Sequence, residues 1–387
     1  MGLSLLDLGQ IAFSTVTSLQ TLGLMMIVGL IMVMSKIMED SGQMARLVNS
    51  FIRLSKDART VGSVMPALIG LLPMPGGALF SAPMVEAALP KGSISADKKT
   101  ILNYWYRHIW EYWWPLYPGV ILAVALLGVE TWQFMVFLAP MTLAAGLVGW
   151  LFILKPMGKK SIEHDGDITW EKMRGFLWEM TPIWLIILIV IIISGLKGFL
   201  SLTGLSFSLP AAFSIMPGLI ISTLWVTIVN HFSLKKILKI SLSFKIFLII
   251  FLVITIMIFK GVMTESHAVS IVRDELMAYH IPIVLVIVLM PFISGLITGI
   301  ALGFVGASFP LIIPMFQHSG FFEYMALAGL AYTFGFMGMM LSPVHLCLLV
   351  TKDFFKASFY DSYRHLIKNV LTIMISSLIL YSILRIL

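Results

Sequence analysis

The stretch PMPGGALFSAPMV, residues 73–85, interrupts an apolar segment of the chain with glycine, serine and proline. The stretch LGFVGASFPLIIP, residues 302–314, interrupts a second apolar segment with the same order of residues. The shared order is a glycine, a serine five residues later and a proline two beyond it: Gly76, Ser81 and Pro83, then Gly303, Ser308 and Pro310. Matching interruptions in two halves of a membrane protein are typical of a transporter's binding site, although glycine and proline are also common in membrane helices generally.

The composition predicts an all-α, polytopic membrane protein. Of the 387 residues, 59% are hydrophobic and 12% are charged, whereas soluble proteins carry about 25% charged residues. Long apolar runs such as residues 183–193 favour helices, because a helix satisfies its own backbone hydrogen bonds in lipid. The single Cys347 excludes a disulfide framework and a cysteine metal cluster. We therefore expect no resident metal or cofactor other than a coupling Na⁺ or H⁺.

The charge pattern predicts how the chain crosses the membrane. The stretches that approach the roughly 20 apolar residues of a membrane span are 19–37, 101–127, 132–154, 176–196, 209–229, 244–259, 324–350 and 370–387. We expect the two interrupted segments, 61–90 and 281–316, to be re-entrant hairpins that enter and leave on one side. Most lysines and arginines then fall on a single side, which the positive-inside rule makes cytoplasmic. The first hairpin opens to the cytoplasm and the second to the outside, and both termini are extracytoplasmic.

The sequences around the hairpins predict an inverted repeat. Each hairpin follows an acidic residue and a serine, at 40–41 and 265–266, and precedes a spanning segment broken by proline, at Pro115 and Pro118 or at Pro343. Carbonyls freed by proline are tolerated in a membrane only where they face protein or a cavity. The predicted domains are a first repeat (1–155), a cytoplasmic linker (156–175), a connecting helix pair (176–231) and a second repeat (232–387). Whether a matching N-terminal helix pair is missing stays open.

The hairpin tips have the chemistry of an anion site. In the first, Pro73 and Pro75 end one half-helix, and Gly76 and Gly77 allow the turn. We expect Ser81 to cap the second half-helix, with Pro83 in its first turn. The exposed N-terminus of such a half-helix favours anions. Ser308 and Pro310 would do the same from the opposite side, and packing through small residues is the alternative.

The stretch NYWYRHIWEYWWPLYP, residues 103–118, allows two interpretations. The first is an aromatic belt at the membrane surface. In the second, Arg107 and Glu111 pair at i,i+4 and either face protein or a cavity or extend to the cytosolic membrane surface. Arg107 would then bind an anionic substrate, and Glu111 or His108 would carry a coupling proton. His345 and Glu86 are further candidates for proton coupling, with ordinary hydrogen bonding as the alternative for His345.

The segments EDSGQMARLV, PMPGGALFSAP and NYWYRHIWEYWWPLYPG resemble a family of prokaryotic integral membrane proteins known as domain of unknown function 401. The resemblance covers essentially the whole chain and is strongest over residues 72–118. That family is similar to the ion-transporter superfamily, which includes gluconate permeases, divalent-anion symporters and dicarboxylate carriers. The resemblance implies a homodimer with an elevator-like moving domain. It also implies substrate or ion binding by Pro75, Gly76, Gly77, Ser81 and Pro83, by Gly303, Gly306, Ser308 and Pro310, and by Pro115, Pro118, Ser342, Pro343 and His345.

Together these observations predict a secondary active transporter of the inner cell membrane. Its substrate would be a small organic anion, a carboxylate, coupled to H⁺ or Na⁺ and bound at the hairpin tips. We expect no enzymatic activity and no nucleic-acid partner. Two alternatives remain: a lipid-handling protein or membrane-embedded enzyme that uses Arg107, His108 and Glu111, and a passive anion channel.

Overall fold

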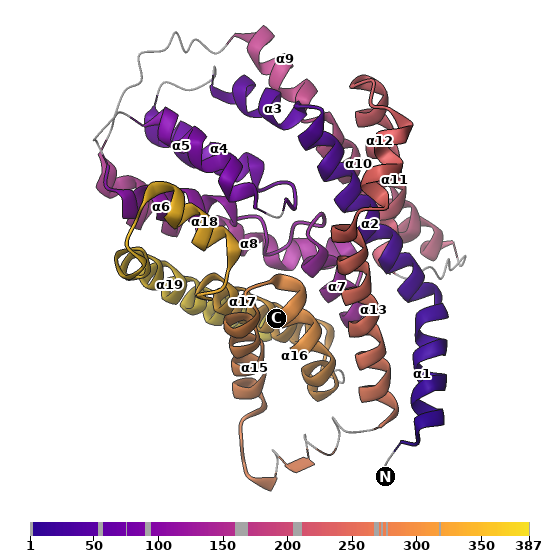
Figure 1. Ribbon diagram of the computed structural model, residues 1–387. Coiled ribbons are helices and arrows are strands. Elements are labelled where there is room, and N and C mark those ends of the chain that lie inside the picture. Colours follow the sequence, from indigo (N-terminus) through magenta and orange to yellow (C-terminus); the bar gives the residue numbers. More distant parts are fainter. Residues whose placement is uncertain are drawn as a thin grey trace.

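A computed structural model describes residues 3–52, 57–74, 76–89, 94–158, 169–203, 211–266, 271, 274–275, 278–316 and 319–386. Within these ranges the chain forms 18 α-helices and a few short π and 3₁₀ turns (Figure 1). The expected all-helical fold is therefore confirmed. Pro75, one of the predicted site residues, lies outside the described residues.

Within the part of the chain that the structure describes, five helices are long and apolar enough to cross a membrane, so the protein is a multi-pass membrane protein. They are α2 (Leu19–Asp40), α8 (Thr131–Gly149) with its extension to Met157, α10 (Thr181–Leu202), α13 (Phe244–Glu265) and α19 (Phe359–Ile386). The extension of α8 consists of a π turn, η1 (Trp150–Leu154), and a 3₁₀ turn, η2 (Lys155–Met157).

Eight other helices in the described ranges form four consecutive pairs, and a break separates the two helices of each pair. They are α4 (Ala58–Ile69) and α5 (Gly77–Ala88), α6 (Ala96–Arg107) and α7 (Pro118–Leu127), α15 (Ile283–Thr298) and α16 (Ala301–Phe316), and α17 (Phe321–Met340) and α18 (Leu346–Phe355). Helices α4 and α5 pack against each other, as do α15 and α16 (Figure 1). The predicted breaks near Pro115 and Pro343 are confirmed. The first lies between α6 and α7, and the second lies between α17 and α18.

The remaining helices pack mainly against the long helices α2, α10 and α13. They are α1 (Leu5–Thr17), α3 (Gln43–Ile52), α9 (Trp170–Glu179), η3 (Ala211–Ile215), α11 (Met216–Val229) and α12 (Leu234–Ser241). Helix α1 packs along α13, α11 packs between α2 and α10, and α3 meets α9 at one end of the molecule (Figure 1). Of this group, α3 also packs on α4 and η3 also packs on α7, which connects the group to the broken helices.

The first break differs from the expected one at its serine. Helix α5 begins at Gly77, and the residue before it, Gly76, has a left-handed conformation with φ of 77°. Ser81 lies inside the helix, where its hydroxyl donates to the carbonyls of Gly77 and Ala78 at 3.3 Å. The prediction that Ser81 caps this helix is wrong, because the left-handed glycine starts the helix one turn earlier.

The second break also lies earlier in the chain than expected. Helix α15 ends at Gly299, a left-handed glycine with φ of 65°, and α16 begins at Ala301. Ser308 is therefore inside α16, and its hydroxyl donates to the Phe304 carbonyl at 2.6 Å. The prediction that residues 303–310 form the tip is wrong. Glycine ends a helix readily in this conformation, whereas a serine within a helix can bond to its own backbone.

Candidate functional site

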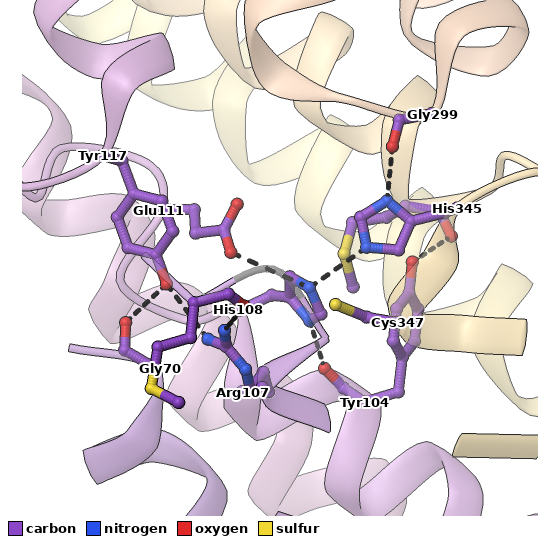
Figure 2. A network of polar contacts seen from close by, with 12 residues as sticks. Gly70, Tyr104, Arg107, His108, Glu111, Tyr117, Gly299, His345 and Cys347 are labelled. Atoms are coloured by element: carbon purple, nitrogen blue, oxygen red, sulfur yellow. Dashed lines mark hydrogen bonds and ion pairs between the residues drawn. The ribbon is translucent and has the colours of Figure 1, made fainter. Parts of the chain in front are cut away.

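The candidate site is a buried polar cluster in which all four helix breaks meet (Figure 2). Arg107, the last residue of α6, is only 2% exposed. Its Nη1 donates to the Tyr117 hydroxyl at 3.2 Å, and its Nη2 donates to the Met74 carbonyl at 3.1 Å. Tyr117 in turn donates to the Gly70 carbonyl at 2.5 Å. The α6–α7 break is thereby joined to the loop between α4 and α5.

The aromatic stretch is part of the protein interior. The Trp110 indole donates to the Ala67 carbonyl at 3.0 Å, and the Trp114 indole donates to the Leu71 carbonyl at 2.8 Å. These carbonyls lie at and beyond the end of α4, where a helix leaves its last acceptors without partners of its own. Tyr104 and Trp105 are buried as well. Of the two interpretations of residues 103–118, the surface belt is therefore wrong.

Arg107 and Glu111 both face the protein interior, but not as a pair on one helix. Helix α6 ends at Arg107, and the chain turns before Glu111, so the expected i,i+4 arrangement is wrong. The missing N–H groups of Pro115 and Pro118 favour irregular backbone here. Glu111 is 7% exposed, and its Oε1 lies 3.7 Å from Nε2 of His108.

Two histidines link the halves of the chain. His108 directs Nδ1 at the Tyr104 carbonyl, 2.6 Å away, and His345 directs Nδ1 at the Gly299 carbonyl, 2.7 Å away. The two Nε2 atoms are 3.2 Å apart. His345 is the residue that precedes α18. The contact between the rings therefore joins the α6–α7 break to the α15–α16 and α17–α18 breaks, as Figure 2 shows.

One donor of the cluster points at no acceptor. Within the described ranges, Nε of Arg107 is buried and has no hydrogen-bond partner. The guanidinium lies against the start of α5, because a Cβ placed on Gly77 would be 2.6 Å from Nη2. On the preceding turn of α6, Asn103 donates to the Ala78 carbonyl and to Thr351 of α18. The free donor thus lies against the start of α5, and the preceding turn of α6 bonds to α5 and α18.

The other predicted site residues of the first half lie at varying distances from this cluster. Pro115 is buried in the α6–α7 break, and Pro118 is the first residue of α7. Pro83 is exposed on α5. Glu86, also on α5, forms an ion pair with Lys99 at 2.7 Å, and its side chain is 45% exposed. A role of these residues in binding or coupling stays a prediction.

In the second half, the predicted residues divide into two groups. Ser342 is buried in the α17–α18 break beside His345, whereas Pro343 is exposed. Gly303, Gly306, Ser308 and Pro310 lie within α16. A Cβ on Gly306 would be 2.4 Å from Ile256 of α13, so this glycine permits close helix packing. The role of these second-half residues in binding stays a prediction.

Sequence reasoning missed several members of the cluster. Tyr104, Tyr117 and Cys347 contribute side chains, and Gly70, Met74 and Gly299 contribute carbonyls. The carbonyls have no sequence signal, because every residue carries one. The position of Tyr117 was predictable, because a tyrosine between two prolines lies near the helix break. Its hydrogen-bond partner at the end of α4 was not predictable, because that contact depends on tertiary structure.

The five spans and the buried cluster at the helix breaks define a multi-pass α-helical membrane protein with an internal polar site. Residues 2–384 match the family described as protein of unknown function DUF401, and the chain belongs to this family. No curated protein matches the chain.

Proposed function

We propose that the protein is a secondary active transporter of a small organic anion, and that Arg107 binds this anion. The observation that supports the proposal is the buried guanidinium whose Nε lacks a partner among the described residues. A charged side chain in the membrane interior costs about 2.5–3.5 kcal/mol on insertion scales. Such residues usually mark a substrate pathway, and a carboxylate supplies the missing acceptor and the opposite charge.

The start of α5 supports the same proposal. The guanidinium packs against Gly77 at the N-terminus of this helix. Helix N-termini carry a partial positive charge and favour anions. Arginine and helix end would therefore attract one ligand together.

We further propose that α4–α5 and α15–α16 are the re-entrant hairpins of an inverted repeat, in a homodimeric, elevator-type transporter of the inner membrane. Both pairs have a left-handed glycine at the break, Gly76 and Gly299. The proposed link to the ion-transporter superfamily rests on the sequence resemblance. Glu111 and the two histidines, next to Arg107 along the cluster, are the groups proposed for coupling to H⁺, with Na⁺ as the other coupling ion.

The proposal is tested by uptake into liposomes that contain the purified protein. Labelled acetate, succinate, citrate and gluconate are supplied under an imposed pH or Na⁺ gradient. We expect gradient-driven uptake of at least one of them. Arg107→Gln should weaken it about 10- to 150-fold, because a hydrogen bond to a charged group contributes about 1.5–3 kcal/mol and 1.4 kcal/mol is a factor of ten.

The matched control is Arg46→Gln. Arg46 is 45% exposed and pairs with Glu179 at 3.0 Å, away from the cluster. Uptake by this variant should equal that of the unmodified protein. Equal uptake by Arg107→Gln would contradict the assignment of the site. Uptake that is independent of both the pH gradient and the Na⁺ gradient would indicate a passive channel instead.

A further inference from the structure

The two histidines face each other with the wrong chemistry for a simple hydrogen bond. A carbonyl oxygen only accepts, so each Nδ1 must carry the hydrogen that it directs at Tyr104 or at Gly299. In the neutral rings both Nε2 atoms are then acceptors. These two lone pairs lie 3.2 Å apart in a buried place. A positively charged species between them would turn this repulsion into attraction.

One further electron-pair donor, the Cys347 thiol, lies at the same place, and a second, Glu111, lies nearby. Cys347 follows His345 by two residues, in the first turn of α18. Its Sγ, one ring nitrogen of His108 and one ring nitrogen of His345 lie within 4.8 Å of one another. Glu111 adds a carboxylate oxygen 3.7 Å from Nε2 of His108. Figure 2 shows the thiol and the two imidazoles directed at one region, with Glu111 on the far side of His108.

We propose that His108, His345 and Cys347 bind a transition-metal ion of the Zn²⁺ type. A tetrahedral zinc ion with Zn–N bonds of about 2.0–2.1 Å places two nitrogen ligands about 3.3 Å apart, close to the observed 3.2 Å. Histidine ligands commonly donate their second N–H to a carbonyl or carboxylate, and both rings do so here. Glu111 or a small molecule would take the fourth position, after a side-chain movement in the case of Glu111.

The cluster has the same net charge with a divalent ion as with a shared proton, so the position of the thiol decides between them. Arg107 already contributes one positive charge to this buried region. A metal ion would be balanced by the Cys347 thiolate and the Glu111 carboxylate, which leaves the charge of Arg107 for an anionic ligand. A proton shared by the two imidazoles would explain why the two rings are in contact. It would not explain why the Cys347 thiol lies beside them. This inference does not depend on the proposed transport activity. While the metal ion is bound, the two histidines cannot carry the coupling proton, and Na⁺ is then the coupling ion.

The test is a titration of the full-length protein in detergent, treated with a chelator, with Co²⁺ as the probe. We expect one Co²⁺ per chain, with the visible bands of a tetrahedral site and a thiolate-to-cobalt charge-transfer band in the near ultraviolet. Zn²⁺ should displace the cobalt and remove these bands. Cys347→Ser should lose the charge-transfer band, and His108→Gln and His345→Gln should weaken binding by at least about tenfold.

The matched control is His365→Gln, since His365 is partly exposed and pairs with Asp97 at 3.0 Å. Its cobalt spectrum should equal that of the unmodified protein. The deciding result comes from the unmodified protein, so it does not depend on the folding of any variant. A wild-type titration without a charge-transfer band would overturn the proposal, and the two imidazoles would then hold a shared proton.

Discussion

At the scale of single residues, Arg107 shows which part of the site the sequence could predict. An arginine and a glutamate in an apolar stretch are conspicuous, because charges in a membrane interior are rare. Their partners were not predictable, because Arg107 bonds to a carbonyl in a loop 33 residues away and to a tyrosine beyond the break. The expected pairing of Arg107 with Glu111 assumed a helix that in fact ends at Arg107.

Gly77 offers a test of this packing that leaves Arg107 itself unchanged. A Cβ in Gly77→Ala would lie 2.6 Å from Nη2 and 2.9 Å from Nε of Arg107. We expect the guanidinium to move and labelled-anion uptake to fall at least about tenfold, the cost of losing one hydrogen bond to a charged group. Gly146→Ala is the control, because nothing lies within 4 Å of the added methyl group. Equal uptake by the two variants would contradict the proposed position of the anion.

Glu86 is expected to stabilise the protein by pairing with a buried lysine. The Glu86 side chain is 45% exposed, but that of Lys99 is only 10% exposed, so Glu86→Gln leaves a largely buried ammonium group without its carboxylate. We expect Glu86→Gln to lower the free energy of unfolding by about 1–3 kcal/mol and to leave the dependence of uptake on the pH gradient unchanged. Thermal unfolding and liposome uptake measure the two effects. Loss of the gradient dependence alone would instead support the prediction that Glu86 carries a coupling proton.

At the scale of elements, the sequence predicted that helices break but placed two breaks too late. Both errors came from assigning serine to a helix start. In lipid a serine hydroxyl inside a helix can bond to the carbonyl one turn earlier, as Ser81 and Ser308 do. The nearby glycines with positive φ, Gly76 and Gly299, mark the breaks instead. Glycine adopts positive φ without help from tertiary contacts, so these two glycines could have located the breaks from the sequence alone.

The packing of α15 on α17 depends on glycines at the contact. A Cβ on Gly338 would lie 2.0 Å from the Phe292 carbonyl oxygen, which is backbone and cannot rotate away. We expect Gly338→Ala to lower the free energy of unfolding by about 1–3 kcal/mol, the usual cost of overpacking. Gly329→Ala on the same helix should have little effect, since its methyl group would meet Leu138 at an ordinary 3.4 Å. Equal melting temperatures for both variants would contradict this packing.

At the scale of the whole molecule, composition was sufficient to predict a multi-pass helical protein. The number and ends of the spans were less predictable, because hydropathy averages over breaks. The stretches 101–127 and 324–350 each read as one span, but each contains two helices and a turn. The convergence of four breaks on one cluster is a property of the tertiary structure alone (Figure 2).

The predicted orientation in the membrane can be tested by labelling. Helix α12 carries Lys235, Lys236 and Lys239 and should lie on the cytoplasmic side. A membrane-impermeant maleimide applied to intact cells should therefore label Thr203→Cys, beyond α10, but label Ser233→Cys only after the cells are opened. Both positions are exposed. The unmodified chain controls for Cys347, and the reverse labelling pattern would contradict the topology.

The proposed transport activity requires an anion bound by Arg107, and ligand-induced thermal stabilisation measures this binding most directly. Unmodified protein and Arg107→Gln are heated with acetate, succinate, citrate and gluconate, each with and without Na⁺. A ligand at 100 times its dissociation constant stabilises the folded protein by about 2.7 kcal/mol. We predict such stabilisation of the unmodified protein by at least one anion, and its loss in Arg107→Gln. No stabilisation by any of these anions, or equal stabilisation of both proteins, would contradict the account.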